Sequence, residues 1–231
     1  LLTILAAGLW PFNFLARNKV AWLPDQDGIQ FYGQGIIVSS EVPNKERKLL
    51  FPDKSITIEI LLRPLLVTGN LPHILTLYDG KAPDIFFVGQ WQSHLIIRSR
   101  TDNPTLRKKG KDYGEIGLNN ALLKDRDCFL TITSGDGGTA LYINGKLMRS
   151  YANHRMLAGV TEEPVRLFLG NSSTGESYWN GNLTGFAIYN RALPADQVSR
   201  SYEAWTGNTP LTTAAEDGCL GMYLFDERKG R

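Results

Sequence analysis

The chain has 231 residues, of which 42% are hydrophobic and 21% charged, and 25 basic and 23 acidic residues give a formal net charge of +2. This composition is typical of a globular protein with a substantial core, and the balanced charge gives no general reason to expect nucleic acid or anionic lipid as a partner. The one basic run, Arg107 to Lys111, is interleaved with Gly and Asp and is interpreted as a solvated loop.

The first ten residues are strongly apolar, and Pro11 and Asn13 then interrupt the run. Ten apolar residues are too few to span a bilayer. They are either the cut end of a longer hydrophobic anchor or signal segment, with Trp10 and Phe12 at the membrane interface, or an arm packed on the following domain. We favour the first interpretation. Residues 1–18 therefore form the anchor, signal or arm, and residues 19–231 form one domain.

Short alternating segments separated by turn residues follow, at the even spacing that is typical of a β-sandwich or barrel. The predicted strands cover residues 28–40 (in two pieces), 55–64, 73–80, 84–92, 94–100, 128–151 (in three pieces), 165–171, 175–190 and 219–227. Residues 101–119 are rich in Asp, Asn, Lys and Gly, which predicts a long surface loop.

The stretch from Cys128 to Tyr151 predicts three strands joined by two tight turns. Residues 129–133 alternate with the period of a half-buried strand, and glycines at 135, 137 and 138 suit a turn. Asn144-Gly145 is the strongest short hairpin signal, because both central residues of a type I′ turn need a positive φ. A meander of this kind is not stable alone, so other strands must cover its apolar face.

A single helix is predicted from Leu193 to Trp205, with Pro194 in its first turn. The two cysteines, Cys128 and Cys219, do not have the spacing of a metal-ligand pair. They form either a disulfide, which suits an oxidising compartment, or two buried free thiols.

Three stretches together resemble laminin-G-like modules. FPDKSITIEILLRP is similar to the strand that opens many of these modules, and the hairpin around YINGK is similar to their central hairpin. VRLFLGNSSTGESYWNGNLTGFAIYNRALPADQVSRSY resembles their closing signature. The resemblance covers roughly residues 28–205. It implies an all-β, concanavalin A-like jelly-roll sandwich of two curved antiparallel sheets with one short helix.

Two further resemblances concern the ends of the chain. The segment MYLFDERKGR is similar to the strand that usually comes first in these modules, so residues 219–227 are predicted to pair near residues 28–38. An LWPFNF start ahead of such a module also resembles the extracytoplasmic part of bacterial VanZ-like membrane proteins.

Glycoside hydrolases on this fold need two carboxylates that face one cleft. Glu59 has no acidic partner on its strand, Glu162 and Glu163 lie in a loop, and the adjacent Asp226 and Glu227 face opposite sides. The sequence therefore predicts no catalytic residues and no enzyme activity.

The resemblance implies a calcium site on an edge loop, with an acidic residue before the IYNRAL strand. That neighbourhood is Leu183-Thr184-Gly185 and has no carboxylate, so Asp226 is the remaining candidate ligand for Ca²⁺. No other cofactor is predicted.

A glycan site needs aromatic faces for stacking and planar polar groups for sugar hydroxyls. Alternation puts only one of Gln90 and Trp91 on an open face, so a core role for these aromatic residues is the alternative. The predicted ligand-binding residues are Gln90, Trp91, Gln92, Arg98, Arg100, Tyr178, Trp179 and Asn180.

These features favour a non-catalytic, extracytoplasmic binding module, membrane-anchored or secreted, for a glycan or cell-envelope polymer. The alternatives are a structural or protein-interaction domain without a small ligand and, third, a hydrolase.

Overall fold

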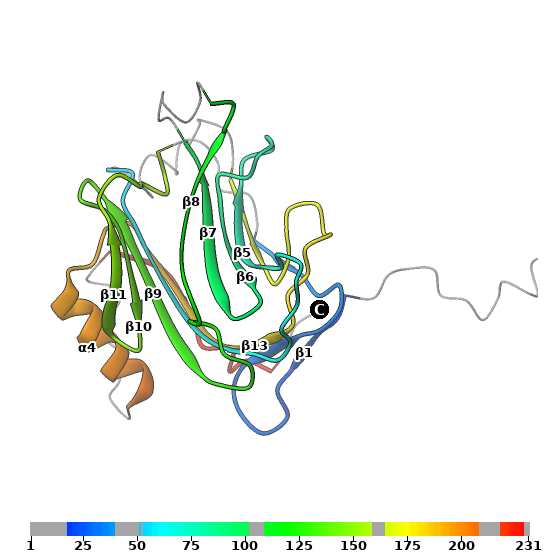
Figure 1. Ribbon diagram of the computed structural model, residues 1–231. Helices are drawn as coiled ribbons and strands as arrows, with labels where there is room; N and C mark the ends of the chain where they lie inside the picture. Colours follow the sequence, from blue (N-terminus) through cyan, green and yellow to red (C-terminus); the bar gives the residue numbers. More distant parts are fainter. Residues whose placement is uncertain are drawn as a thin grey trace, which may run out of the picture.

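The computed structural model describes residues 18–39, 51, 53–101, 109–158, 165–207 and 218–228. Within these ranges two antiparallel sheets face each other, and one helix, α4 (Ala195–Thr206), packs on the outside of the first sheet (Figure 1). The prediction of a two-sheet, all-β sandwich with a short helix is confirmed.

The first sheet has the strand order β1-β2-β13-β4-β9-β10-β11, and β14 also pairs with β13. Its strands are β1 (Val20–Trp22), β2 (Ile29–Phe31), β4 (Ile56–Pro64), β9 (Cys128–Gly135), β10 (Gly138–Ile143), β11 (Lys146–Tyr151), β13 (Gly181–Tyr189) and β14 (Cys219–Tyr223).

The second sheet has the strand order β3-β12-β5-β6-β7-β8. Its strands are β3 (Ile37–Val38), β5 (His73–Tyr78), β6 (Phe86–Trp91), β7 (His94–Arg100), β8 (Tyr113–Leu118) and β12 (Arg166–Leu169).

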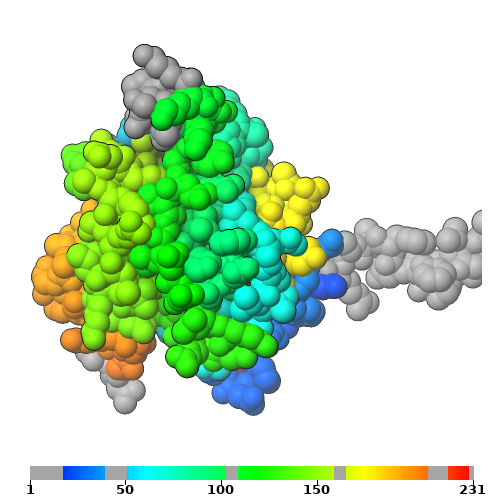
Figure 2. All heavy atoms as spheres, in the orientation of Figure 1, coloured from blue at the N-terminus to red at the C-terminus, as the bar shows by residue number. Residues whose placement is uncertain are grey.

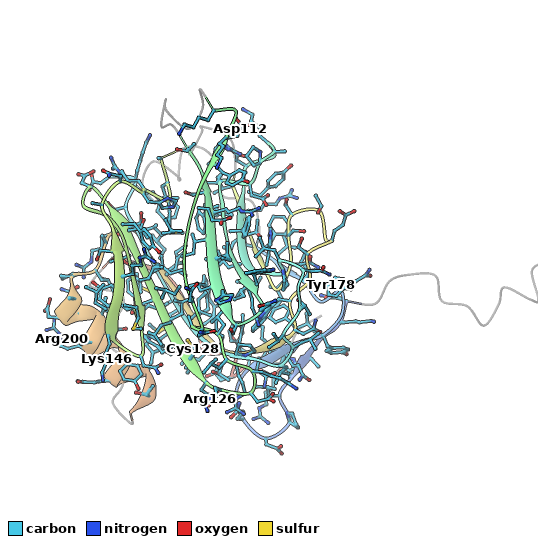
Figure 3. All side chains as sticks on the ribbon, viewed as in Figure 1. Asp112, Arg126, Cys128, Lys146, Tyr178 and Arg200 are labelled. Atoms are coloured by element: carbon cyan, nitrogen blue, oxygen red, sulfur yellow. The ribbon has the colours of Figure 1, made fainter. Side chains whose placement is uncertain are left out.

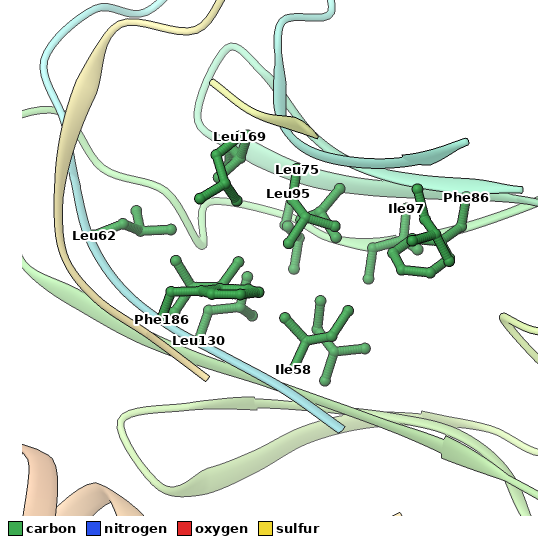
Figure 4. Packing of buried hydrophobic residues seen from close by; sticks show 14 of the residues in the cluster. Ile58, Leu62, Leu75, Phe86, Leu95, Ile97, Leu130, Leu169 and Phe186 are labelled. Atoms are coloured by element: carbon green, nitrogen blue, oxygen red, sulfur yellow. The ribbon is translucent and has the colours of Figure 1, made fainter. Parts of the chain in front are cut away.

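The main core lies between the two sheets (Figure 4). Ile58, Leu130 and Phe186 project from the first sheet, and Leu75 and Ile97 meet them from the second. All five are fully buried, and each such side chain contributes about 1.5–3 kcal/mol relative to an exposed one. Since strand side chains alternate, the residues between these positions face outward, and on the second sheet that outward face carries the candidate site.

The three-stranded meander predicted from Cys128 to Tyr151 is confirmed as β9, β10 and β11. Asn144 and Gly145 have φ values of 50° and 74°, as the hairpin between β10 and β11 requires. The Asn144 side chain accepts a hydrogen bond from the Phe129 backbone N–H at 3.0 Å, so the turn is also tied to β9.

The prediction of a loop over 101–119 is wrong for residues 113–118, which form β8. This strand is the edge of the second sheet and pairs with β7. Its inward side chains include Ile116 and Leu118, while Glu115 faces outward to Arg98. Gly117 is needed in this strand, because a Cβ there would lie 2.1 Å from the carbonyl oxygen of Leu95.

The strand near the end of the chain is shorter than predicted and covers Cys219–Tyr223. Both β2 and β14 pair with β13, at opposite ends of that strand. Beyond β14, the carbonyl oxygen of Phe225 accepts a hydrogen bond from the Gly28 N–H at 3.0 Å. Residues 219–227 therefore lie beside the start of β2, as predicted, although their ladder partner is β13.

Residues 1–17, most of the predicted anchor or arm, lie outside the described ranges. Among the described residues, no helix is both long and apolar enough to cross a membrane.

Both cysteines are free thiols, on opposite faces of the first sheet. Cys128 packs in the core between the sheets, and burial raises the pKa of its thiol to about 12. Cys219 packs with the smaller apolar cluster under α4.

Helix α4 is fastened to the first sheet through the buried carboxylate of Glu59. One carboxylate oxygen, Oε2, accepts hydrogen bonds from Ser201 Oγ at 2.8 Å, Trp205 Nε1 at 3.0 Å and Tyr189 Oη at 3.0 Å. Within the described part of the chain the other oxygen, Oε1, has no hydrogen-bond partner, and neither has the hydroxyl of its cross-strand neighbour Thr131. Burial raises the pKa of the Glu59 carboxyl, and the three hydrogen bonds oppose that shift.

Candidate functional site

A pocket of about 270 Å³ opens on the outer face of the second sheet. Its walls come from β5, β6, β7, β8 and two loops, one between β5 and β6 and the other between β12 and β13. The lining residues are Tyr78, Ala82, Pro83, Asp84, Phe87, Arg98, Ser99, Tyr113, Ser173 and Thr174. The loop between β12 and β13, yellow in Figure 2, lies on the opposite side of the molecule from α4, which is orange. Tyr178 of that loop and Arg200 of α4 show the same separation in Figure 3.

Arg98 is the central charged group of the pocket. Its cross-strand neighbours on the outer face are Phe87 on β6 and Glu115 on β8. The guanidinium carbon lies 4.9 Å from the ring centroid of Tyr113 and 5.8 Å from that of Phe87. Its Nε donates a hydrogen bond to Glu115 Oε2, which orients the guanidinium. Within the described part of the chain the Nη nitrogens have no partner, so they are available to a ligand.

His73 supports Phe87 from below. The two rings stack with centroids 3.8 Å apart and planes 13° apart, and the imidazole Nδ1 lies 3.0 Å from Thr76 Oγ1. Burial, with a smaller contribution from the positive charge of Arg98, lowers the pKa of His73 to about 4. His73 is therefore neutral at pH 7, and it supports the pocket residue Phe87 through ring stacking and not through a charge.

Asp84 supplies a carboxylate to the opposite wall. Its Oδ1 accepts a hydrogen bond from Ser173 Oγ at 2.7 Å, which joins the two pocket loops. Burial raises the pKa of the half-buried Asp84 carboxyl. Its second oxygen, Oδ2, makes no hydrogen bond within the described ranges and can accept one from a ligand.

Arg100 shapes the wall that carries Asp84. Its guanidinium makes two hydrogen bonds to Asp79, at 2.7 and 2.9 Å, and others to the carbonyl oxygens of Lys81 and Pro83. The Asp79 side chain is fully buried, so this pair is a fixed internal brace. Arg100 therefore holds the loop that carries Asp84.

Of the adjacent residues Gln90 and Trp91, the structure turns Trp91 to the open face. Trp91 is 43% exposed, stacks on His94 with centroids 5.4 Å apart and donates from Nε1 to the Gly69 carbonyl oxygen. Gln90 faces the core and is 1% exposed, and its Oε1 accepts a hydrogen bond from Trp179 Nε1 at 2.8 Å. Trp179 is fully buried. Gln90 and Trp179 are thus core residues, and their burial is the reason that the predicted ligand contacts at these two positions are not available on the surface.

The remaining predicted residues do not reach the pocket. Gln92 occupies the turn between β6 and β7 with a φ of 53°, and Tyr178 is exposed beside His73. Asn180 Oδ1 accepts a hydrogen bond from the Gly33 N–H at 2.9 Å, which is a structural contact.

Asp226 is exposed near the end of the described chain. In the described ranges no three His, Cys, Asp or Glu residues gather closely enough to hold a metal ion. The calcium site at Asp226 remains a prediction.

Sequence reasoning named Arg98 but missed other residues that line the pocket with it, among them Tyr78, Asp84, Phe87, Tyr113 and Ser173. Phe87 could have been predicted, because it alternates with the core residues Phe86 and Val88 and so must face outward with Trp91.

A family model for the concanavalin A-like lectin/glucanases superfamily, of laminin-G-like type, matches residues 39–199. The chain belongs to this superfamily. A search of curated proteins finds no match. The resemblance to VanZ-like membrane proteins has no support from these comparisons and remains a prediction.

Solved structures of the same fold have low sequence identity to this superfamily member. A botulinum neurotoxin DC binding domain in complex with rat synaptotagmin II is 18% identical, with a TM-score of 0.56, and the match covers 83% of this chain and 47% of that one. Trypanosoma rangeli sialidase is 13% identical, with a TM-score of 0.59 and coverage of 81% and 29%. The CBM40 of the Ruminococcus gnavus IT-sialidase, bound to α2,3-sialyllactose, is 13% identical, with a TM-score of 0.52 and coverage of 72% and 98%. The chain thus spans about half the length of the toxin chain and nearly all of the CBM40.

Proposed function

We propose that this chain is a non-catalytic, extracytoplasmic binding module whose ligand is a glycan or a cell-envelope polymer. The observation that carries the proposal is the pocket of Tyr113, Phe87, Arg98 and Asp84 on the outer face of the second sheet. Aromatic rings offer flat faces to a sugar ring, while the guanidinium donates to sugar hydroxyls and the carboxylate accepts from them.

Proteins of the same fold support the proposal in general terms. One of them, the CBM40, was solved with α2,3-sialyllactose, and another is described as a neurotoxin whose cell entry depends on two ganglioside molecules.

The pocket favours binding over hydrolysis. Among its described lining residues Asp84 is the one carboxylate, whereas a glycosidase needs an acid and a nucleophile or base on two sides of the bond. Glu115 beside it is paired to Arg98, and Glu59 lies on the other sheet beneath α4.

Glycan and cell-wall retention assays followed by calorimetry test the proposal. We expect Tyr113→Ala to weaken glycan binding by about fivefold or more, because an aromatic contact contributes about 1 kcal/mol. Tyr32→Ala is the matched control. Tyr32 directly follows β2 of the first sheet, is comparably exposed and does not line the pocket. Lack of retention of the unmodified protein on every glycan and wall polymer would refute the proposal.

A second candidate, a protein-interaction domain, is favoured by β11. This strand is the edge of the first sheet, and Leu147 and Met148 on it are both more than half exposed. Unpaired edges can accept an added strand from a partner. Binding that is lost in Met148→Lys but kept in Tyr113→Ala would support this candidate instead.

A further inference from the structure

We infer that the pocket takes uncharged glycans and discriminates against glycans that carry a carboxylate, an inference that rests on the proposed glycan function. Among the described residues, the two charged groups that line the pocket, together with Glu115 and the neighbouring Arg100 and Asp79, form two ion pairs and one additional carboxylate. Arg98 pairs with Glu115, and Arg100 pairs with Asp79. Asp84 belongs to no ion pair within the described part of the chain, so the five groups together carry one net negative charge.

Two side chains of the pocket have hydrogen-bonding atoms left for a ligand, namely a donor on one side, Arg98, and an acceptor on the other side, Asp84. Arg98 uses Nε for Glu115 and keeps its Nη nitrogens, which can only donate. Asp84 uses Oδ1 for Ser173 and keeps Oδ2, which accepts when the carboxyl is ionised. The two groups line the same pocket.

Two neighbouring hydroxyls of a sugar satisfy both sides at once. One hydroxyl oxygen accepts from Arg98, and the other hydroxyl donates to Asp84, while Tyr113 and Phe87 cover a face of the ring. This arrangement leaves the charge of the pocket unchanged, and both Arg98 and Asp84 have a hydrogen-bond partner.

A sugar carboxylate satisfies only the donor side. It would accept from the Nη nitrogens of Arg98, but it would lie close to Glu115 and in the same pocket as Asp84, so it meets two like charges. Burial already raises the pKa of the Asp84 carboxyl, and a bound anion would raise it further. Arg100 cannot compensate, because its guanidinium is engaged by Asp79 and by two carbonyl oxygens.

Glycan pairs in which only one member carries carboxylates provide the test, for example lactose against α2,3-sialyllactose and methyl-esterified against free oligogalacturonate. Across such pairs on an array, and by calorimetry for the pair with the strongest signal, we expect the uncharged member to bind at least about fivefold more tightly. The ratio should fall as salt is added, because salt screens the repulsion.

Asp84→Asn should shift that ratio by about fivefold toward the acidic member, and Asp127→Asn, in an exposed ion pair with Arg63 on the first sheet, should leave it unchanged. Equal or tighter binding of the acidic members by the unmodified protein would overturn the inference while leaving the glycan function in place. Binding of neither member in any pair would overturn the glycan function itself. If Asp84→Asn does not fold, the ratio measured on the unmodified protein still decides the inference.

Discussion

Trp91 extends the candidate site beyond the pocket. It lies four residues after Phe87 on β6, on the same face, and strand geometry places the two about 13 Å apart. A small sugar bound against Phe87 and Tyr113 is too short to reach that far, whereas an oligosaccharide laid along the strand reaches both aromatic positions.

We therefore expect Trp91→Ala to weaken binding of a long oligosaccharide by about fivefold and to leave binding of its monosaccharide unchanged. Calorimetry with both lengths measures the difference, and Tyr32→Ala serves as the control. A loss of equal size for both lengths would mean that Trp91 acts through the pocket and not as a separate contact.

Alternation within one strand predicts which residues share a face of the sheet. The sequence does not predict which residues from different loops meet in the site. It separated Trp91 from Gln90, but it could not show that Asp84 and Ser173, 89 residues apart, would be joined by a hydrogen bond. Because β12 pairs antiparallel with β5, the loops that follow these two strands leave from opposite ends of the pair, and the contact requires the loop after β12 to fold back toward Asp84. Local periodicity carries no information on the order of strands in a sheet.

At the scale of elements, the hairpin between β10 and β11 also forms part of the seat for α4. Gly145 has a φ of 74°, and a Cβ there would lie 3.0 Å from the Cβ and ring of Tyr202 on the helix. The Ser199 hydroxyl donates to the Gly145 carbonyl oxygen at 3.2 Å. The residue is thus constrained by its own conformation and by the helix.

Gly145→Ala should lower the free energy of unfolding by about 1–3 kcal/mol, because alanine is strained at this φ and its methyl group presses on α4. Denaturant unfolding measures the loss. Gly137→Ala, in the preceding turn, is the control and should cost little, since a Cβ there meets no atom within 4 Å. Equal costs at both positions would contradict the close contact with the helix.

The hairpin was predictable because Asn-Gly is a local signal, whereas β8 was not, because its reasons for being a strand are not local. Its sequence, YGEIGL, has two glycines and few β-favouring residues. It is held by pairing with β7, by the Arg98–Glu115 pair and by the close approach at Gly117. Each of these depends on residues outside the segment.

At the scale of the whole molecule, the two outer faces of the sandwich serve different purposes. The second sheet leaves its outer face open for the pocket, whereas the first sheet covers part of its outer face with α4. Covering a sheet that contains the carboxylate of Glu59 makes the stability of the fold depend on the protonation state of that group.

Thr131 lies opposite Glu59 in the ladder between β4 and β9, and within the described ranges neither Glu59 Oε1 nor Thr131 Oγ1 has a hydrogen-bond partner. Protonation of Glu59 would remove a buried negative charge. This arrangement agrees with the raised pKa of the Glu59 carboxyl, whose main cause is burial.

A carboxyl whose pKa is raised on folding contributes most to stability below its unfolded pKa, near 4.5, and that contribution falls as the pH rises through the folded pKa. His73 and His154 have the opposite effect. Burial lowers the pKa of each to about 4, so their contribution is full above 6.5 and falls as the pH drops toward 4. The contribution of Glu59 to the pH dependence of stability is isolated by comparing two proteins that both contain His73 and His154.

Glu59→Gln provides that comparison, because the amide keeps an acceptor for Ser201, Tyr189 and Trp205 and is uncharged at every pH. We expect the variant to match the unmodified protein near pH 4 and to exceed it at neutral pH by about 1 kcal/mol, because only the unmodified protein then carries a buried charge at this position. Denaturant unfolding across pH 4–8 measures the difference in free energy of unfolding between Glu59→Gln and the unmodified protein. For the control Asp127→Asn, the corresponding difference should not change with pH over this range. A variant that is less stable than the unmodified protein at neutral pH would show that the ionised carboxylate, and not the protonated acid, holds α4 to the sheet.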